Sequence, residues 1–189
     1  MIWLSADLHL GHYNAIRHAN RPFKTLEEMD TTLIENWRSK IKDDDTVYYL
    51  GDLCWKSPDK YLDKLTGKIH LILGNHDEHF RKYYENSRRF ESIERLAIIK
   101  VNKMPVSLCH YPMLSWASSC HGALHFFGHC HGNRTHSGLA YDIGVDNNNY
   151  LPISLDDAIA ILEEKRKTIG VKKQTILNMF RRFKRRIGL

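Results

Sequence analysis

The chain has 189 residues, of which 42% are hydrophobic and 11% aromatic, so it can bury a substantial core and general disorder is excluded. Its longest apolar runs have the length of a strand, so we expect neither a transmembrane segment nor a secretory signal, and we expect a cytoplasmic protein. The four cysteines lack the Cys-x-x-Cys spacing of a zinc module and are too few for a disulfide scaffold, so free thiols are expected.

The net charge of +6 is unevenly distributed along the chain. Residues 165–189 hold ten of the 28 basic residues and none of the 22 acidic residues, which leaves residues 1–164 with a net charge of −4. We therefore expect a domain over residues 1–168, of which residues 1–164 are mildly acidic, and a basic, amphipathic C-terminal tail over residues 169–189.

The first polar motif follows an apolar N-terminal segment. Residues 1–6 predict a strand, and Asp7 and His9 follow it as an Asp-x-His pair whose side chains share one side of an extended segment. Taken alone, the pair is better explained by a strand-end turn with a capping aspartate. The polar loop then continues with residues that either line a pocket for an anionic substrate or are solvated, namely His12, Asn14 and Arg17.

A helix and a second strand come next. Thr25 and Glu28 form a capping box, and apolar residues then recur at helical spacing, which predicts an amphipathic helix over about 26–41. Residues 46–50 predict the second strand, which ends at a glycine followed by the carboxylate of Asp52.

The third strand ends in the most polar motif of the chain. The apolar run 69–73 is followed by Gly74-Asn75-His76-Asp77, so these side chains are expected at the C-terminal end of a buried strand, where layered α/β folds build their sites. An amide, an imidazole and a carboxylate in succession can supply a metal ligand, a proton donor and a group that orients this donor.

Histidines follow two further strands. Residues 93–101 and 104–109 predict two strands joined by a tight turn, and the second ends at His110, which alone could be a packed histidine. A later strand runs into His129 and His131, which lie between two glycines. Packing hardly explains this pair, because the glycines free the backbone and allow both imidazoles to point to one side.

The remaining segment is predicted to complete the domain. Residues 140–145 predict a strand, and residues 146–149 are most simply a turn. Ser154 is expected to cap a last helix, in which apolar residues form one face.

Together, the polar motifs form five blocks: Asp7-x-His9, Gly51-Asp52, Gly74-Asn75-His76-Asp77, His110 and Gly128-His129-x-His131. In order and spacing they resemble the signature of the calcineurin-like metallophosphoesterases, and the chain looks like the small bacterial and phage-type members. The resemblance implies an α/β fold, a four-layer α/β/β/α sandwich of two mixed sheets flanked by helices. The chain departs from many members after the last block, where residues 143–146 replace a Gly-Ser-containing segment.

The resemblance also implies a dinuclear metal centre and a mechanism. One metal would be held by four residues, Asp7, His9, Asp52 and His131. The other would share Asp52 as a bridge and add three residues, Asn75, His110 and His129. A metal-bridging hydroxide would attack phosphorus, His76 would assist the leaving group, and Asp77 would orient His76. Manganese is the expected metal, while iron, nickel, cobalt and zinc also suit these ligands.

Two classes of function are compatible with these features. The first is a metal-dependent phosphohydrolase that cleaves a phosphomonoester or a phosphodiester, which the presence of both His76 and Asp52 favours. The alternative is a metal-binding scaffold or nucleic-acid-associated protein that keeps the fold with little turnover. Neither the natural substrate nor the oligomeric state is predicted.

The basic tail has two interpretations. Its apolar residues recur at helical spacing, at Ile176, Phe180, Phe183 and Ile187. In the first interpretation, a final helix packs this apolar stripe on the body of the protein. In the second, the basic side chains contact nucleic acid or an anionic membrane surface.

Overall fold

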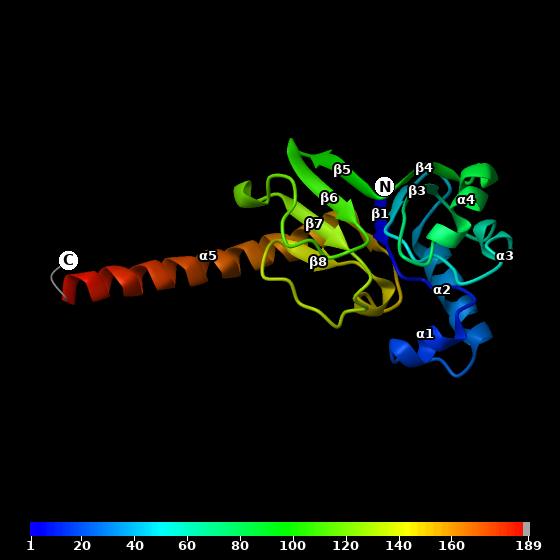
Figure 1. Cartoon of the computed structure of the whole chain (residues 1–189), viewed down its shortest axis with the longest axis horizontal. Helices are drawn as coiled ribbons and strands as arrows, with labels where there is room; N and C mark the ends of the chain where they lie inside the picture. The colour runs from blue at the N-terminus through cyan, green and yellow to red at the C-terminus, as the bar shows by residue number, and fades with distance from the viewer. Residues whose placement is uncertain (187–189) are drawn as a thin grey trace.

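The computed structural model describes the backbone of residues 1–186 and the side chains of residues 1–170. Two mixed sheets form the body of the protein (Figure 1), with the strand orders β4-β3-β2-β1-β9 and β5-β6-β7-β8. The first sheet consists of β1 (Ile2–Ser5), β2 (Thr46–Tyr49), β3 (Lys68–Ile72), β4 (Phe90–Glu94) and β9 (Ile153–Ser154). The second consists of β5 (Leu96–Val101), β6 (Met104–Cys109), β7 (Leu124–Phe127) and β8 (Ala140–Asp142).

Most strands in both sheets are parallel. In the first sheet β1 to β4 are parallel, and the short β9 is antiparallel at the edge. In the second sheet β6, β7 and β8 are parallel, and β5 is antiparallel. The register aligns Ser5 with Tyr49, and Tyr49 with Leu71. The loops that follow these three strands therefore begin at one edge of the sheet, which is the usual position of sites in such sheets.

Three helices, α2 (Leu26–Lys40), α3 (Asp59–Leu62) and α4 (Arg81–Ser87), pack on the first sheet, and α1 (Tyr13–His18) contacts α2. Helix α5 (Leu155–Arg186) instead contacts β1, β8 and β9. The 3-10 turns are η1 (Glu78–Phe80), η2 (Ser119–His121) and η3 (Val145–Asn147). The predicted capping box of α2 is confirmed, because Oγ1 of Thr25 accepts a hydrogen bond from the backbone N–H of Glu28 at 3.1 Å.

Two hydrophobic cores hold these layers together. The larger core packs α2, α3 and α4 on the first sheet and contains the fully buried Trp37 and Tyr84. The other lies between the two sheets, where Leu4 and Phe126 belong to one buried cluster that also includes Leu162 of α5. The arrangement of two mixed sheets with flanking helices confirms the predicted α/β fold class.

Two predicted strands have different bounds in the structure. The segment 93–101 divides at Arg95 into β4 and β5, and these belong to different sheets. An alternating apolar pattern cannot reveal such a crossing, because both halves carry the same periodicity. The strand predicted over 140–145 ends at Asp142, although Gly144 still forms an isolated bridge with Ala6.

Helix α5 leads away from the two sheets toward the C-terminus (Figure 1). Ser154 caps it as predicted, since its Oγ accepts a hydrogen bond from the backbone N–H of Asp157 at 3.1 Å. The helix passes residue 168 without interruption, whereas the apolar stripe predicted for the tail lies outside the residues whose side chains are described. Within the described part of the chain, no helix combines the length and apolar composition needed to cross a bilayer. All four cysteines are free, as predicted.

Candidate metal centre

The candidate metal ligands follow the C-terminal ends of strands from both sheets. Asp7, Asp52 and Asn75 lie beyond β1, β2 and β3 of the first sheet, and His110 and His129 lie beyond β6 and β7 of the second. The topology therefore brings together all five blocks that the sequence analysis identified.

The backbone is left-handed at most of these positions, although none of them is glycine. The dihedral angle φ is positive at five candidate ligands, namely Asp7 (61°), His9 (51°), Asp52 (59°), His129 (68°) and His131 (49°). Such a conformation costs a non-glycine residue about 1–2 kcal/mol. Strain of this kind concentrates at functional sites, where the surrounding structure holds side chains in a required direction.

Two glycines allow the ligand loops to approach one another closely. A Cβ atom on Gly128 would lie only 2.6 Å from Oδ2 of Asp7, and a Cβ atom on Gly74 would overlap the carboxylate of Asp52. Any other residue at these two positions would displace one of the buried carboxylates.

Donor atoms converge in three groups, each within 4.8 Å. They are Asp7, His9 and His131; His9, Asp52 and His76; and Asp52, His110 and His129. Oδ2 of Asp52 lies 3.6 Å from Nε2 of His9 and 3.5 Å from Nε2 of His110. Asp52 is thus the carboxylate that the groups on both sides of the site share.

The ring orientation of His110 is fixed by the main chain. Its Nδ1–H donates to the carbonyl oxygen of Leu50 at 2.7 Å, so Nε2 is left with its lone pair facing the site. Oδ1 of Asn75 lies 3.2 Å from this nitrogen. A hydrogen bond from a ligating histidine to a backbone carbonyl is a common way to hold the ring for a metal.

His131 is supported by two residues that the sequence analysis did not identify as functional. Its Nδ1 lies 2.6 Å from Oδ2 of Asp146, and the buried guanidinium of Arg21 donates to both oxygens of Asp146 at 2.8 Å. Arg21 also donates to the carbonyl oxygens of Asp7 and Leu8, so one side chain ties the first ligand loop to the last. Although burial alone would raise the pKa of Asp146, hydrogen bonds from His131 and Arg21 bring it below its ordinary value.

The electrostatics of the cluster fit a divalent cation. Burial raises the pKa of Asp7 well above its ordinary value, and the neighbouring charge of Asp52 raises it further. Burial lowers the pKa of His9, and neither ring nitrogen of His9 has a hydrogen-bond partner among the described residues. A buried group without a partner is costly, and buried carboxylates repel one another. A bound cation would remove both penalties.

The side chains of His76 and Asp77 lie next to the cluster, but no hydrogen bond joins them in the described part of the chain. Nε2 of His76 lies 3.9 Å from Oδ2 of Asp52. The carboxylate of Asp77 accepts hydrogen bonds from the backbone N–H groups of Asp52 (2.7 Å), Gly74 (2.8 Å) and Leu53 (3.1 Å), and none joins it to His76 in the described residues. The structure thus differs from the expectation that Asp77 orients His76. Asp77 is turned inward and supports the loop of Asp52 instead.

The three residues proposed to bind substrate are separated in the structure. His12 is buried, and its ring lies 6.0 Å from that of His76. Asn14 and Arg17 are exposed on α1, and the described residues include no side-chain hydrogen bond or ion pair from either to the site. The structure instead places Trp55 beside the site, 4.0 Å from the ring of His12. A single tryptophan in a loop gave no signal in the sequence.

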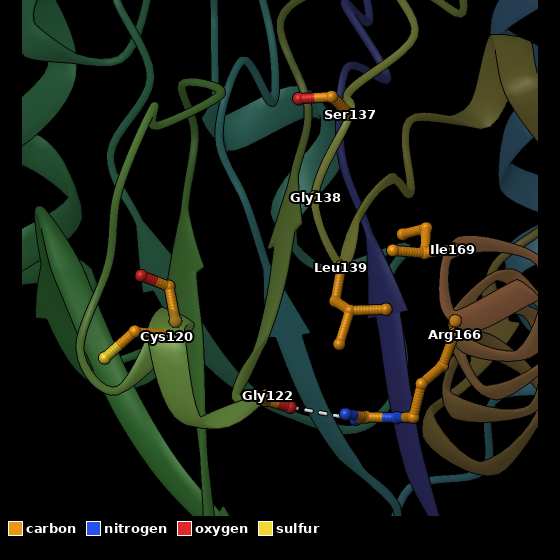
Figure 2. A pocket seen from close by; sticks show the side chains of 9 residues that line it. Cys120, Gly122, Ser137, Gly138, Leu139, Arg166 and Ile169 are labelled. Atoms are coloured by element: carbon orange, nitrogen blue, oxygen red, sulfur yellow. Dashed lines mark hydrogen bonds between the residues drawn. The ribbon is translucent and has the colours of Figure 1, made fainter. Parts of the chain in front are cut away.

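A hollow of about 340 Å³ lies apart from this cluster, beside α5 (Figure 2). Arg166 is the charged residue in its lining, and its guanidinium donates to the carbonyl oxygen of Gly122 at 2.8 Å and to Glu163 at 3.0 Å. Because these donors already have partners, the hollow is a poor candidate for an anion site.

Comparisons with known proteins agree with the resemblance. A family profile described as calcineurin-like phosphoesterase matches residues 1–170. An uncharacterized protein of Methanocaldococcus jannaschii is 33% identical over 175 residues, which cover 86% of this chain and 92% of that protein. The gene 66 protein of a Mycobacterium phage is 38% identical over 40% of this chain and 39% of its own length. The crystal structure of an Aquifex aeolicus protein of unknown function superposes with a TM-score of 0.69 at 26% identity, over 85% of this chain and 98% of that one.

Proposed function

The chain belongs to the calcineurin-like phosphoesterase family, and we propose that it is a dinuclear metal-dependent phosphohydrolase that cleaves a phosphomonoester or a phosphodiester. The observation that carries this proposal is the position of Asp52. Its carboxylate belongs to donor groups on both sides of the site, which is the arrangement that two neighbouring cations require.

The proposed ligand sets follow from the donor groups and the resemblance. One cation would be held by Asp7, His9, Asp52 and His131, and the other by Asp52, Asn75, His110 and His129. Two divalent cations, most readily manganese, would supply positive charge opposite the phosphoryl oxygens and a nucleophile from water at neutral pH. The chain itself supplies the fixed imidazoles and the buried carboxylates that hold these charges in place.

We assign the leaving-group role to His76. Its side chain is about one-third exposed, whereas the ligand His110 is fully buried, so His76 lies on the open side of the cluster. The general acid must reach the ester oxygen, which an imidazole at the mouth of the site can do. The short distance to Asp52 would also allow His76 to bind a metal. The metal content of His76→Ala distinguishes a metal ligand from a proton donor.

The test is a metal-dependent activity screen. The protein is stripped with a chelator and reloaded with Mn²⁺, Fe²⁺, Co²⁺, Ni²⁺ or Zn²⁺. Turnover of p-nitrophenyl phosphate and bis(p-nitrophenyl) phosphate is then measured together with the metal content. The proposal predicts two metals per chain and turnover that disappears on chelation. Two bound metals without turnover of any ester would favour the scaffold interpretation, and failure to bind metal would contradict both.

We further propose that the basic tail contacts an anionic partner, either nucleic acid or an anionic membrane surface. Residues 172–189 carry seven basic and no acidic residues, and α5 leads away from the sheets in this direction (Figure 1). Removing residues 172–189 should leave hydrolysis of a small phosphoester nearly unchanged and weaken binding to single-stranded DNA or to anionic vesicles at low salt. If the intact chain binds neither at low salt, the contact is excluded.

A further inference from the structure

A small aromatic pocket lies directly beside the proposed leaving-group histidine. It has a volume of about 200 Å³ and is lined by Trp55, His76, His79 and Phe80. None of these residues is Asp, Glu, Lys or Arg, so the lining offers ring faces instead of formal charges. Ligand sites for whole drug-sized molecules are usually about 300–1,000 Å³, so this pocket has the size of a subsite for one part of a ligand.

Trp55 is held in place although it is exposed. Its indole lies nearly parallel to the ring of His12, with centroids 4.0 Å apart and an angle of 7° between the planes. Its backbone N–H donates to the carbonyl oxygen of Leu10 at 2.9 Å. Nevertheless 46% of its surface remains accessible. A large aromatic side chain that is fixed before binding loses little conformational entropy when a ligand stacks on it.

His12 is the inner ring of this stack. Its imidazole is buried, whereas the indole of Trp55 is exposed. Trp55 in turn meets His76 edge to face, with ring centroids 5.0 Å apart. The three rings thus form a continuous aromatic wall from α1 to the metal cluster, and His76 belongs both to this wall and to a donor group with Asp52.

The position of the wall determines which part of a substrate it can contact. If His76 protonates the leaving oxygen, as the proposed function requires, the organic group attached to this oxygen must lie next to His76. The pocket that His76 lines together with Trp55 and Phe80 offers space for this group. We propose that this pocket binds a planar aromatic group on the leaving-group side, so that the substrate is a phosphoester of a nucleoside or of a small aromatic alcohol. The proposal rests on the proposed function.

The experiment compares substrates that differ only in the aromatic group. AMP is compared with ribose 5-phosphate, and benzyl phosphate with cyclohexylmethyl phosphate, or their methyl diesters if the enzyme requires a diester. Within each pair the leaving oxygen is of the same type, so a disturbed His76 would affect both members equally. We expect wild-type kcat/KM to favour the aromatic member of at least one pair by roughly 10-fold, since ring stacking contributes about this much.

Variants at position 55 test whether this preference comes from the pocket. Trp55→Ala should reduce the ratio within the preferred pair to about one, and Trp55→Phe should keep most of it. Tyr13→Ala is the matched control, because Tyr13 is another exposed aromatic residue and does not line the pocket, and it should leave the ratio unchanged. The pair that shows the preference identifies the source of the ring, a nucleoside or an aromatic alcohol.

Failure of the pocket and failure of the proposed function can be distinguished. Binding of adenosine and benzyl alcohol is measured by NMR chemical-shift perturbation of the indole N–H signals, with no turnover needed. Chemical-shift changes that are present in the wild type and absent in Trp55→Ala would support the pocket even if no ester is hydrolysed. The pocket proposal is overturned if turnover occurs with equal kcat/KM within both pairs, or if Trp55→Ala leaves a preference intact.

Discussion

Two buried histidines from different regions of the molecule have opposite environments. His125 lies within β7 of the second sheet, where its Nδ1–H donates to the carbonyl oxygen of Ser107 at 3.0 Å and its Nε2 accepts from the backbone N–H of Met113 at 3.2 Å. His9 lies at the strand ends, is also buried, and has no hydrogen-bond partner for either ring nitrogen among the described residues. An unpartnered buried polar group costs about 1–3 kcal/mol. The hydrogen bonds of His125 are thus satisfied within the fold, whereas those of His9 would be satisfied only by a bound ligand.

The backbones of these regions differ in the same way. His125 has the regular geometry of a strand, whereas His9 is left-handed at φ 51°. Regular structure satisfies its own hydrogen bonds, so it leaves nothing for a ligand. The strand ends of this protein combine strained backbone, repelling carboxylates and unpartnered imidazole nitrogens, and a bound cation would relieve the repulsion and supply the missing partner.

The largest expected effect is that of removing the shared charge. Asp52→Asn preserves the shape of the side chain but should lose at least one metal and about 10³-fold or more in kcat, because several kcal/mol of transition-state stabilisation depend on the two cations. Metal analysis and kinetics of the same sample provide the measurement. Asp156→Asn on the exposed side of α5 is the matched control. Full occupancy of two sites with normal turnover in Asp52→Asn would contradict the bridging role.

The next effect concerns the leaving group. His76→Ala should keep both metals and lose roughly 10²- to 10⁴-fold in kcat on alkyl phosphates, with a smaller loss on p-nitrophenyl phosphate, whose leaving group needs no proton. His121→Ala, at an exposed histidine outside both this pocket and the donor groups, serves as the control. Loss of a metal would show that His76 is a ligand, and equal losses on both kinds of substrate would rule out proton donation.

A smaller effect should come from the support of His131. Asp146→Asn still accepts a hydrogen bond from His131 but no longer balances the buried charge of Arg21. We expect metal affinity to fall about 10- to 100-fold, as is typical for partners of ligating histidines, with kcat at saturating metal much less affected. Titration calorimetry of the metal-free protein measures this affinity. An affinity equal to that of Asp156→Asn would show that the Arg21–Asp146 pair is structural only.

The smallest effect should come from His125 and concern only the pH dependence of folding stability. Burial lowers the pKa of His125 below its ordinary value near 6.5, so the unfolded chain binds a proton there before the folded chain does. Its contribution to stability is therefore present above pH 6.5 and is lost as the pH falls below this value, by at most about 1.4 kcal/mol per pH unit. Urea unfolding is measured between pH 7 and pH 5. The free energy of unfolding should change less with pH in His125→Gln than in the wild type, whether or not metal is bound. An unchanged pH dependence would mean that His125 binds protons equally in the folded and unfolded states, and it would contradict the lowered pKa.

The sequence alone was sufficient to locate the ends of the strands and the polar blocks that follow them. An apolar run that ends in glycine is a local signal. The signal for His129 and His131 is local as well, because the glycines on both sides lie within the same five residues. The family and the α/β fold follow from the order of these blocks. The single strand predicted over 93–101 was wrong because the alternating pattern is the same on both sides of Arg95, where the chain passes between sheets.

Only the tertiary structure determined how the site is supported. Arg21 and Asp146 are 125 residues apart, and the segment that contains Asp146 was interpreted as a simple turn. Asp77 adjoins His76 in sequence, yet its carboxylate supports the loop of Asp52. Trp55 became relevant only through its contact with His12. Local patterns reveal which side chains leave a strand end, but their partners depend on loops that meet only after the two sheets have packed together.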